Sequence, residues 1–294
     1  MSYSSFRVTH RSVAEAALAN LQRNLRRVAD LQDQVSSLKR IRTPSDDPVG
    51  AVSALKFRSQ VGRREQIDRN LSDASAWLNT IDASLRGVLE HLNRARDLGI
   101  QGRNASLGSS ERAALAAEVD QLRQGVLNLA NTKYLDRPVF AGNARVATAY
   151  DVTGAYLGDD GVVERSIAPG QRLAVNATGD AVFGAAGSTV FDALTALSDS
   201  LRNDPTKIDA AVADLDSATE RVLGQLGDVG ARGRRVDDMK SRNALTTDDL
   251  KSSLSEVEDV DITKALIDLQ QTAYQAALAA TARAIQPSLV DFLR

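Results

Sequence analysis

The sequence predicts a mainly α-helical protein with a small β-rich insertion. Its N-terminal and C-terminal arms should pack as an elongated antiparallel helical bundle or coiled coil. Apolar residues recur at steps of three and four over long stretches, which is typical of amphipathic helices. Glycine is concentrated in one segment, because residues 137–190 hold 8 of the 19 glycines. Aromatic residues make up only 4% of the chain, which favours packed helices over a large enzyme core.

The N-terminal arm, residues 1–136, carries three apolar stripes, and each stripe favours a helix. The first stripe changes phase once, after its fourth member. The first consists of Leu18, Leu21, Leu25, Val28, Leu31, Val35 and Leu38, the second of Leu78, Ile81, Leu85, Val88, Leu92 and Ala95, and the third of Leu115, Val119, Leu122, Val126 and Leu129.

The segment RIRTPSDDPVG, residues 40–50, separates the first two of these helices. Pro44 ends the first helix, because the residue before a proline is pushed out of the helical conformation. Asp47 followed by Pro48 has the pattern of an N-cap and a first helical residue. Asp46 adds a second carboxylate. We therefore expect a hinge with a helix cap at Pro44, Asp46, Asp47 and Pro48, while a cation site remains the alternative.

Residues 137–190 contain short β-prone runs between turn signals, so we expect a β-rich insertion there. The GDDG segment at 158–161 indicates a turn, with a cation site as the alternative.

The C-terminal arm, residues 191–294, carries the longest stripe, which runs from Ile208 to Val236 and keeps its phase as far as Val257. A shifted heptad follows, and its second half is nearly all alanine. Small residues let helices approach closely, so we expect this heptad to form an assembly or chaperone seam. Its members are Ile262, Leu266, Leu269, Ala273, Ala276 and Ala280.

Charge supports the pairing of the two arms. Residues 1–50 carry 8 basic and 5 acidic residues, whereas residues 255–294 carry 3 and 6. The whole chain has a formal net charge of −2, so neither nucleic acid nor an anionic membrane is the expected main partner. The sequence has no run of 18 apolar residues, and we expect no membrane insertion.

Motifs for catalysis or for a cofactor are missing from the sequence. It has no cysteine, no glycine-rich phosphate loop, and no second histidine at the helical spacing of a zinc site. The start of the chain has no apolar stretch typical of a cleaved secretory signal. The arginine-rich segment GARGRRVDD could meet phosphate, but its aspartates favour a mixed-charge helix face.

Four segments in order resemble the flagellin superfamily. They are RIRTPSDDPVGAVSALKFR at 40–58, NTKYLDRPVFAGN at 131–143, GDVGARGRRVDDM at 227–239, and the C-terminal stretch from VEDVDITKAL to QPSLVDFLR at 257–294. The TPSDDP form and the DFLR ending are more similar to the subunits that join hook to filament than to filament flagellin. The resemblance covers nearly the whole chain outside about 145–190.

The resemblance implies a structural subunit of the bacterial flagellum with no enzymatic activity and no cofactor. Its expected partners are a neighbouring hook-associated protein, flagellin and further copies of itself in a ring. It also implies an extracellular location, export without a cleaved signal peptide, and a chaperone that holds the C-terminal region. The β-rich insertion would face outward. Filament flagellin is the nearer alternative, and a cytosolic helical scaffold or bundle enzyme is the more distant one.

Overall fold

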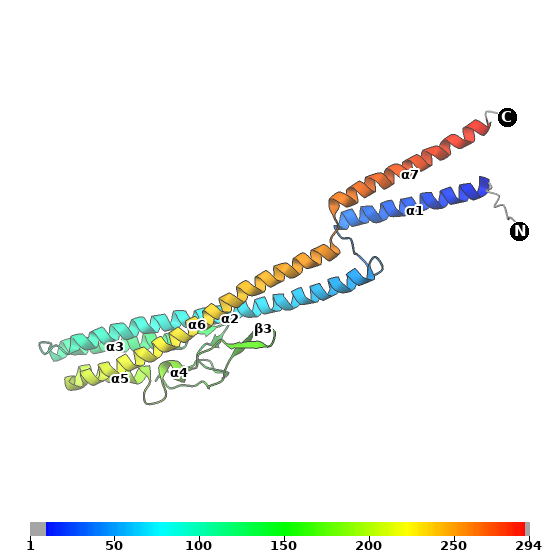
Figure 1. The fold of residues 1–294 in the computed structure, drawn as a ribbon. Helices are drawn as coiled ribbons and strands as arrows, with labels where there is room; N and C mark the ends of the chain where they lie inside the picture. Colours follow the sequence, from blue (N-terminus) through cyan, green and yellow to red (C-terminus); the bar gives the residue numbers. More distant parts are fainter. Residues whose placement is uncertain (1–9, 292–294) are drawn as a thin grey trace. The chain divides into compact units, whose positions relative to one another are not determined.

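The computed structural model describes the backbone of residues 10–291, and side chains within residues 15–281 except at residue 17. It confirms a mainly α-helical fold with small β elements (Figure 1). The principal helices are α1 (His10–Ser37), α2 (Pro48–Gly102), α3 (Ser109–Ala130), α5 (Val190–Asn203), α6 (Ile208–Glu258) and α7 (Ile262–Asp291). The shorter elements are β1 (Lys133–Tyr134), β2 (Arg137–Pro138), β3 (Glu164–Ala168), β4 (Gln171–Ala174), α4 (Gly179–Phe183) and the 3-10 helix η1 (Pro205–Lys207).

The chain forms two compact units. Unit one combines the residues up to 62 with those from 248 onward, and unit two comprises residues 63–247. Helices α2 and α6 contribute to both units, so the units cut across the three segments expected from the sequence. None of the described helices has an apolar stretch long enough to cross a membrane.

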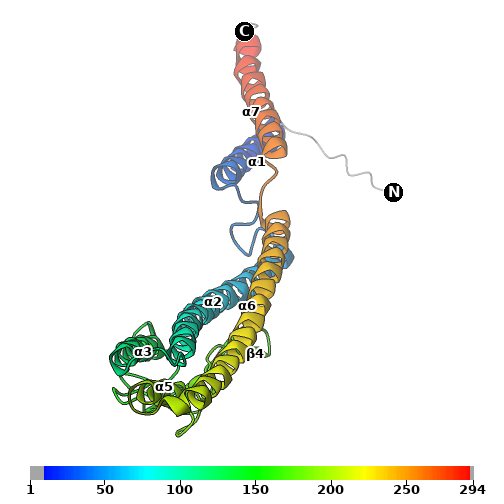
Figure 2. The same cartoon turned by 90° about the vertical axis from the view of Figure 1, so that its left-hand side faces the viewer.

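In unit two the predicted stripe of α2 forms the centre of the core. All six residues of that stripe, from Leu78 to Ala95, are at most 2% exposed. Helices α3 and α5 pack against each other (Figure 2). An ion pair from Arg96 Nε to Asp216 Oδ1, 2.6 Å long, joins α2 to α6. Leucine, isoleucine and valine at helical spacing thus bury one continuous face, as the sequence predicts.

The segment expected to be β-rich contains little regular structure. Strands β1 and β2 pair antiparallel over two residues each, and β3 pairs antiparallel with β4. An aromatic cluster joins a loop of this segment to two helices: Tyr150, in the loop, contacts Phe183 of α4 and Phe191 of α5 with ring centroids 5.3 and 5.1 Å apart. This cluster belongs to the same hydrophobic core as α2. The segment therefore packs on the helices of unit two.

In unit one, α1 and α7 pack side by side and run antiparallel (Figure 1). Among the α7 side chains that the structure describes, residues 262–281, the buried ones are Ala265, Thr272 and Ala276, and all three are small. The first predicted stripe is only partly buried. Leu21, Val28, Leu31 and Val35 are half-buried on α1, whereas Leu18 and Leu25 are 45% and 54% exposed and Leu38 lies beyond the end of the helix. The bundle formed by the N-terminal and C-terminal arms is therefore present.

Candidate functional site

Two links between helices lie side by side in unit one. Residues 38–47 join α1 to α2, and residues 259–261 join α6 to α7. Arg40 N donates to the carbonyl of Glu258 at 2.7 Å, and Val260 N donates to the carbonyl of Leu38 at 3.1 Å. Lys39 and Asp259 form an antiparallel bridge between the links. We call this arrangement the link crossing.

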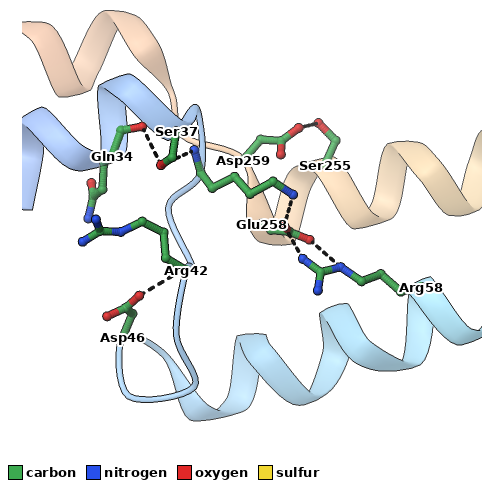
Figure 3. A network of polar contacts seen from close by, with 9 residues as sticks. Gln34, Ser37, Arg42, Asp46, Arg58, Ser255, Glu258 and Asp259 are labelled. Atoms are coloured by element: carbon green, nitrogen blue, oxygen red, sulfur yellow. Dashed lines mark hydrogen bonds and ion pairs between the residues drawn. The ribbon is translucent and has the colours of Figure 1, made fainter.

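The carboxylate of Glu258 lies at the centre of the link crossing (Figure 3). Its side chain is 1% exposed, and it forms ion pairs with Lys39 and Arg58. Arg58 Nε donates to Glu258 Oε2 at 3.1 Å. Burial alone would raise the pKa of Glu258, but the hydrogen bonds from Lys39 and Arg58 outweigh burial and lower that pKa below its ordinary value. The carboxylate is therefore held ionised by one residue from a link and one from α2.

The predicted hinge supplies the other side of the crossing. Asp47 lies immediately before α2, and its Oδ1 accepts a hydrogen bond from Gly50 N at 2.9 Å. This is N-cap geometry. Asp46 Oδ2 accepts from Arg42 N at 2.9 Å and from Thr43 N at 2.8 Å. These backbone hydrogen bonds, the one from Thr43 first for Asp46 and the one from Gly50 for Asp47, lower the pKa of each carboxyl group.

Pro48 occupies the place that the sequence predicts, but Pro44 does not end the first helix, because α1 already ends at Ser37, where Leu38 follows with a φ of 58°. Pro48 is the first residue of α2, where the missing N–H leaves no helical hydrogen bond unmade. Pro44 lies in the turn that Asp46 N closes on the carbonyl of Thr43 at 3.0 Å. Within the part of the chain that the structure describes, no three acidic or histidine side chains are placed to hold a metal ion. In the GDDG segment, Asp159 Oδ1 accepts backbone hydrogen bonds from Asn143 and Gly161.

The shifted heptad of α7 divides between two faces. Leu269 is half-buried and Ala276 is 9% exposed, on the side that packs against α1. Ile262 is 46% exposed and Leu266 48% exposed, and Ala273 and Ala280 are also exposed. The residues that pack on α1 follow a different heptad, made of Ala265, Leu269, Thr272 and Ala276.

Apolar residues also continue around the exposed side of α7. Ile267, Tyr274 and Leu278 are each at least half exposed. We call the whole exposed set the outer face of α7; it consists of Ile262, Leu266, Ile267, Ala273, Tyr274, Leu278 and Ala280. A helix that is apolar on most sides is normally buried on most sides.

Sequence reasoning did not single out Glu258, Lys39 or Arg58. The only signal was the acidic segment VEDVD, which is also what a helix start contains. Arg58 lies 200 positions before Glu258, so their pairing depends on the way the two arms fold together.

Comparisons with known proteins agree with this architecture. The model of the bacterial flagellin N-terminal helical region matches residues 8–144, and that of the bacterial flagellin C-terminal helical region matches residues 206–293. Flagellar hook-associated protein 3 of Escherichia coli (strain K12) is 25% identical over 290 residues, which cover 87% of this chain and 92% of that protein. Flagellin FlaB2 of Treponema pallidum (strain Nichols) is 26% identical over 272 residues, covering 89% and 91%.

The crystal structure of Bacillus cereus FlgL has the same fold. It matches with a TM-score of 0.62 at 22% identity and covers 68% of this chain and 99% of that chain. The two family models together span well over half of the sequence. They include the link crossing and the described part of α7. The chain therefore belongs to the bacterial flagellin family.

Proposed function

We propose that this chain is a structural subunit of the bacterial flagellum that joins hook to filament. Family membership supports a flagellar role, and the alignment with flagellar hook-associated protein 3 of Escherichia coli along most of both chains supports the junction. The hinge sequence TPSDDP, which resembles that branch of the family, agrees with it.

The outer face of α7 is the structural observation that carries the proposal. Four of its large side chains, those of Ile262, Leu266, Ile267 and Leu278, are 46–52% exposed. Exposed apolar residues that gather on one helix mark an interaction surface. Ala273 and Ala280 lie among them, so another helix could approach α7 closely there. A subunit that assembles through its terminal helices requires such a surface.

The proposed partners follow from this role. We expect contacts with a neighbouring hook-associated protein and with flagellin, and self-association in a ring. The C-terminal region, including the outer face of α7, would be covered by an export chaperone before assembly. We expect the protein to be exported without a cleaved signal peptide and to act outside the cell, with the segment at 137–190 facing outward. No catalysis is part of this function.

Electron microscopy of cells that lack the gene tests the proposal. The expected result is normal hooks without attached filaments, with flagellin released into the medium. The intact gene should restore filaments when it is returned. Cells that keep their filaments after the deletion would contradict the junction role.

Filament flagellin is a second candidate, favoured by the alignment with Treponema pallidum FlaB2 at nearly the same identity and coverage. The purified chain distinguishes the two candidates. A filament subunit should polymerise alone into long filaments, whereas a junction subunit should not.

A further inference from the structure

We propose that Glu258 is a positioning residue for assembly. Its ionised carboxylate latches the two links together and thereby fixes where α7 starts and which way its outer face points from α1. Only the role of Glu258 in assembly rests on the proposed function. The latch itself is a property of the isolated chain.

The geometry gives Glu258 two roles in the same place. Its backbone carbonyl accepts hydrogen bonds from Arg40 N at 2.7 Å and from Ile41 N at 3.3 Å. Its side chain bonds both Lys39 and Arg58 while almost fully buried. Glu258 is the last residue of α6 and α7 begins at Ile262, so only three residues separate Glu258 from the start of α7.

Neutralising this carboxylate would leave two cations side by side. Lys39 and Arg58 are each about half exposed, so water screens them in part, but their shared counter-charge would be gone. Charge-assisted hydrogen bonds are about twice as strong as neutral ones, and a glutamine could not replace both. We therefore expect the hydrogen bonds between the links to weaken.

The other charged groups around Glu258 are engaged elsewhere. Arg40 donates to the carbonyl of Val257 at 2.5 Å and pairs with Asp47 at 3.2 Å. On the α6–α7 link, Asp259 accepts from Ser255 Oγ at 2.6 Å, and Asp261 caps α7 by accepting from Lys264 N at 3.0 Å. Glu258 is thus the carboxylate that both Lys39 and Arg58 contact among the described residues.

The sign of the pH effect follows from this arrangement. The folded state lowers the pKa of Glu258, so the latch is fully closed above the pKa of an unfolded glutamate, about 4.3. It opens as the pH falls through the lower pKa of the folded state. Glu258→Gln should reproduce the acid state at neutral pH.

Residue-resolved amide exchange on the full chain tests the latch. The amides of Arg40, Ile41 and Val260 are the readout, because each donates across the link crossing. Exchange rates are divided by the intrinsic rate at each pH. We expect Glu258→Gln to lower their protection at least tenfold at pH 7. The wild-type chain should keep this protection above about pH 4.3 and lose it as the pH falls further below that value, because the pKa of Glu258 is lowered in the folded state.

Two further variants separate charge from shape. Asp216→Asn removes an exposed ion pair in unit two and should leave these three amides unchanged. In the double variant Lys39→Met, Arg58→Met, the buried carboxylate has no cation left, so the additional change Glu258→Gln should leave protection unchanged or raise it. A merely structural role for the glutamate side chain would give the same loss in both backgrounds.

The possible outcomes test the latch and the proposed function separately. The latch would be overturned if the three amides keep their protection in Glu258→Gln, or if their protection depends on pH equally in the variant and in the wild-type chain. This holds even if deletion of the gene removes filaments. If amide protection depends on the charge of Glu258 but cells keep their filaments after the gene is deleted, the latch is supported and the junction role is rejected. If both hold, Glu258→Gln cells should show fewer attached filaments than Asp216→Asn cells.

Discussion

Two alanines of α7, three residues apart, allow a matched test of its two faces. Ala276 is 9% exposed on the side of α1, whereas Ala273 is exposed on the outer face. Leucine ranks just behind alanine in helix propensity, so neither substitution disturbs the helix itself. Ala276→Leu adds bulk to a packed interface, and such overpacking costs about 1–3 kcal/mol. Ala273→Leu changes an exposed position, where substitutions usually stay within about 0.5 kcal/mol.

Thermal unfolding followed by circular dichroism measures the first effect. At roughly 2–4 °C per kcal/mol, Ala276→Leu should lower the melting temperature of the purified chain by about 2–12 °C, and Ala273→Leu should not change it. Swimming assays and electron microscopy measure the effect of Ala273→Leu on filament attachment. Ala273→Leu should remain soluble and exported but impair filament attachment. A normal melting curve for Ala276→Leu, or normal filaments with Ala273→Leu, would refute the assignment of the corresponding face.

Substitutions at four further positions test a helix cap and individual backbone conformations. Asp47→Ala should lower the melting temperature, and Asp47→Asn should retain most of it because asparagine also caps helices; stabilisation by added calcium or magnesium would instead indicate a cation site. Gly227→Ala should raise the free energy of unfolding by about 1 kcal/mol, since its added Cβ meets open space. Gly99→Ala is the control and should destabilise, because its Cβ would lie 2.7 Å from Val212 Cγ2. Leu135→Gly should stabilise by up to about 1 kcal/mol in denaturant titrations, because Leu135 has a φ of 47° and its side chain is 77% exposed.

The sequence was most informative where large apolar residues alternate with polar ones. The stripes of α2 and α6 could be predicted in phase, and the α6 stripe continues through buried Asn243 and Thr247 as expected. The amide nitrogen of Asn243 donates to the carbonyl of Arg64 at 3.0 Å, whereas its Oδ1 is buried without a hydrogen-bond partner. Periodicity alone was sufficient there, because the buried apolar residues recur at heptad spacing along one face of each helix.

Periodicity could not identify which face of α7 packs against α1. Apolar residues occupy most of its circumference, so two overlapping heptads fit equally well, and only the position of α1 decides between them. The predicted seam therefore combines Ala276, which packs within the chain, with Ala273, which does not. The link crossing could not be predicted from the sequence for a related reason. A glutamate at the end of a helix has no pattern that indicates a distant arginine.

The composition of the α1–α7 interface explains why α7 has so much exposed apolar surface. Within the described side chains of α7, the buried ones are Ala265, Thr272 and Ala276. The hydrophobic effect scales with apolar area removed from water, so small side chains contribute less than the leucines, isoleucine and valine of α2. The pairing of α1 with α7 is thus the weaker of the two cores, and packing of a neighbouring subunit on the outer face would add the stabilisation that the interface lacks. In that arrangement the buried charge of Glu258 acts where packing is poorest. It fixes the start of α7 by directed ion pairs and backbone hydrogen bonds, which small side chains cannot do by packing alone.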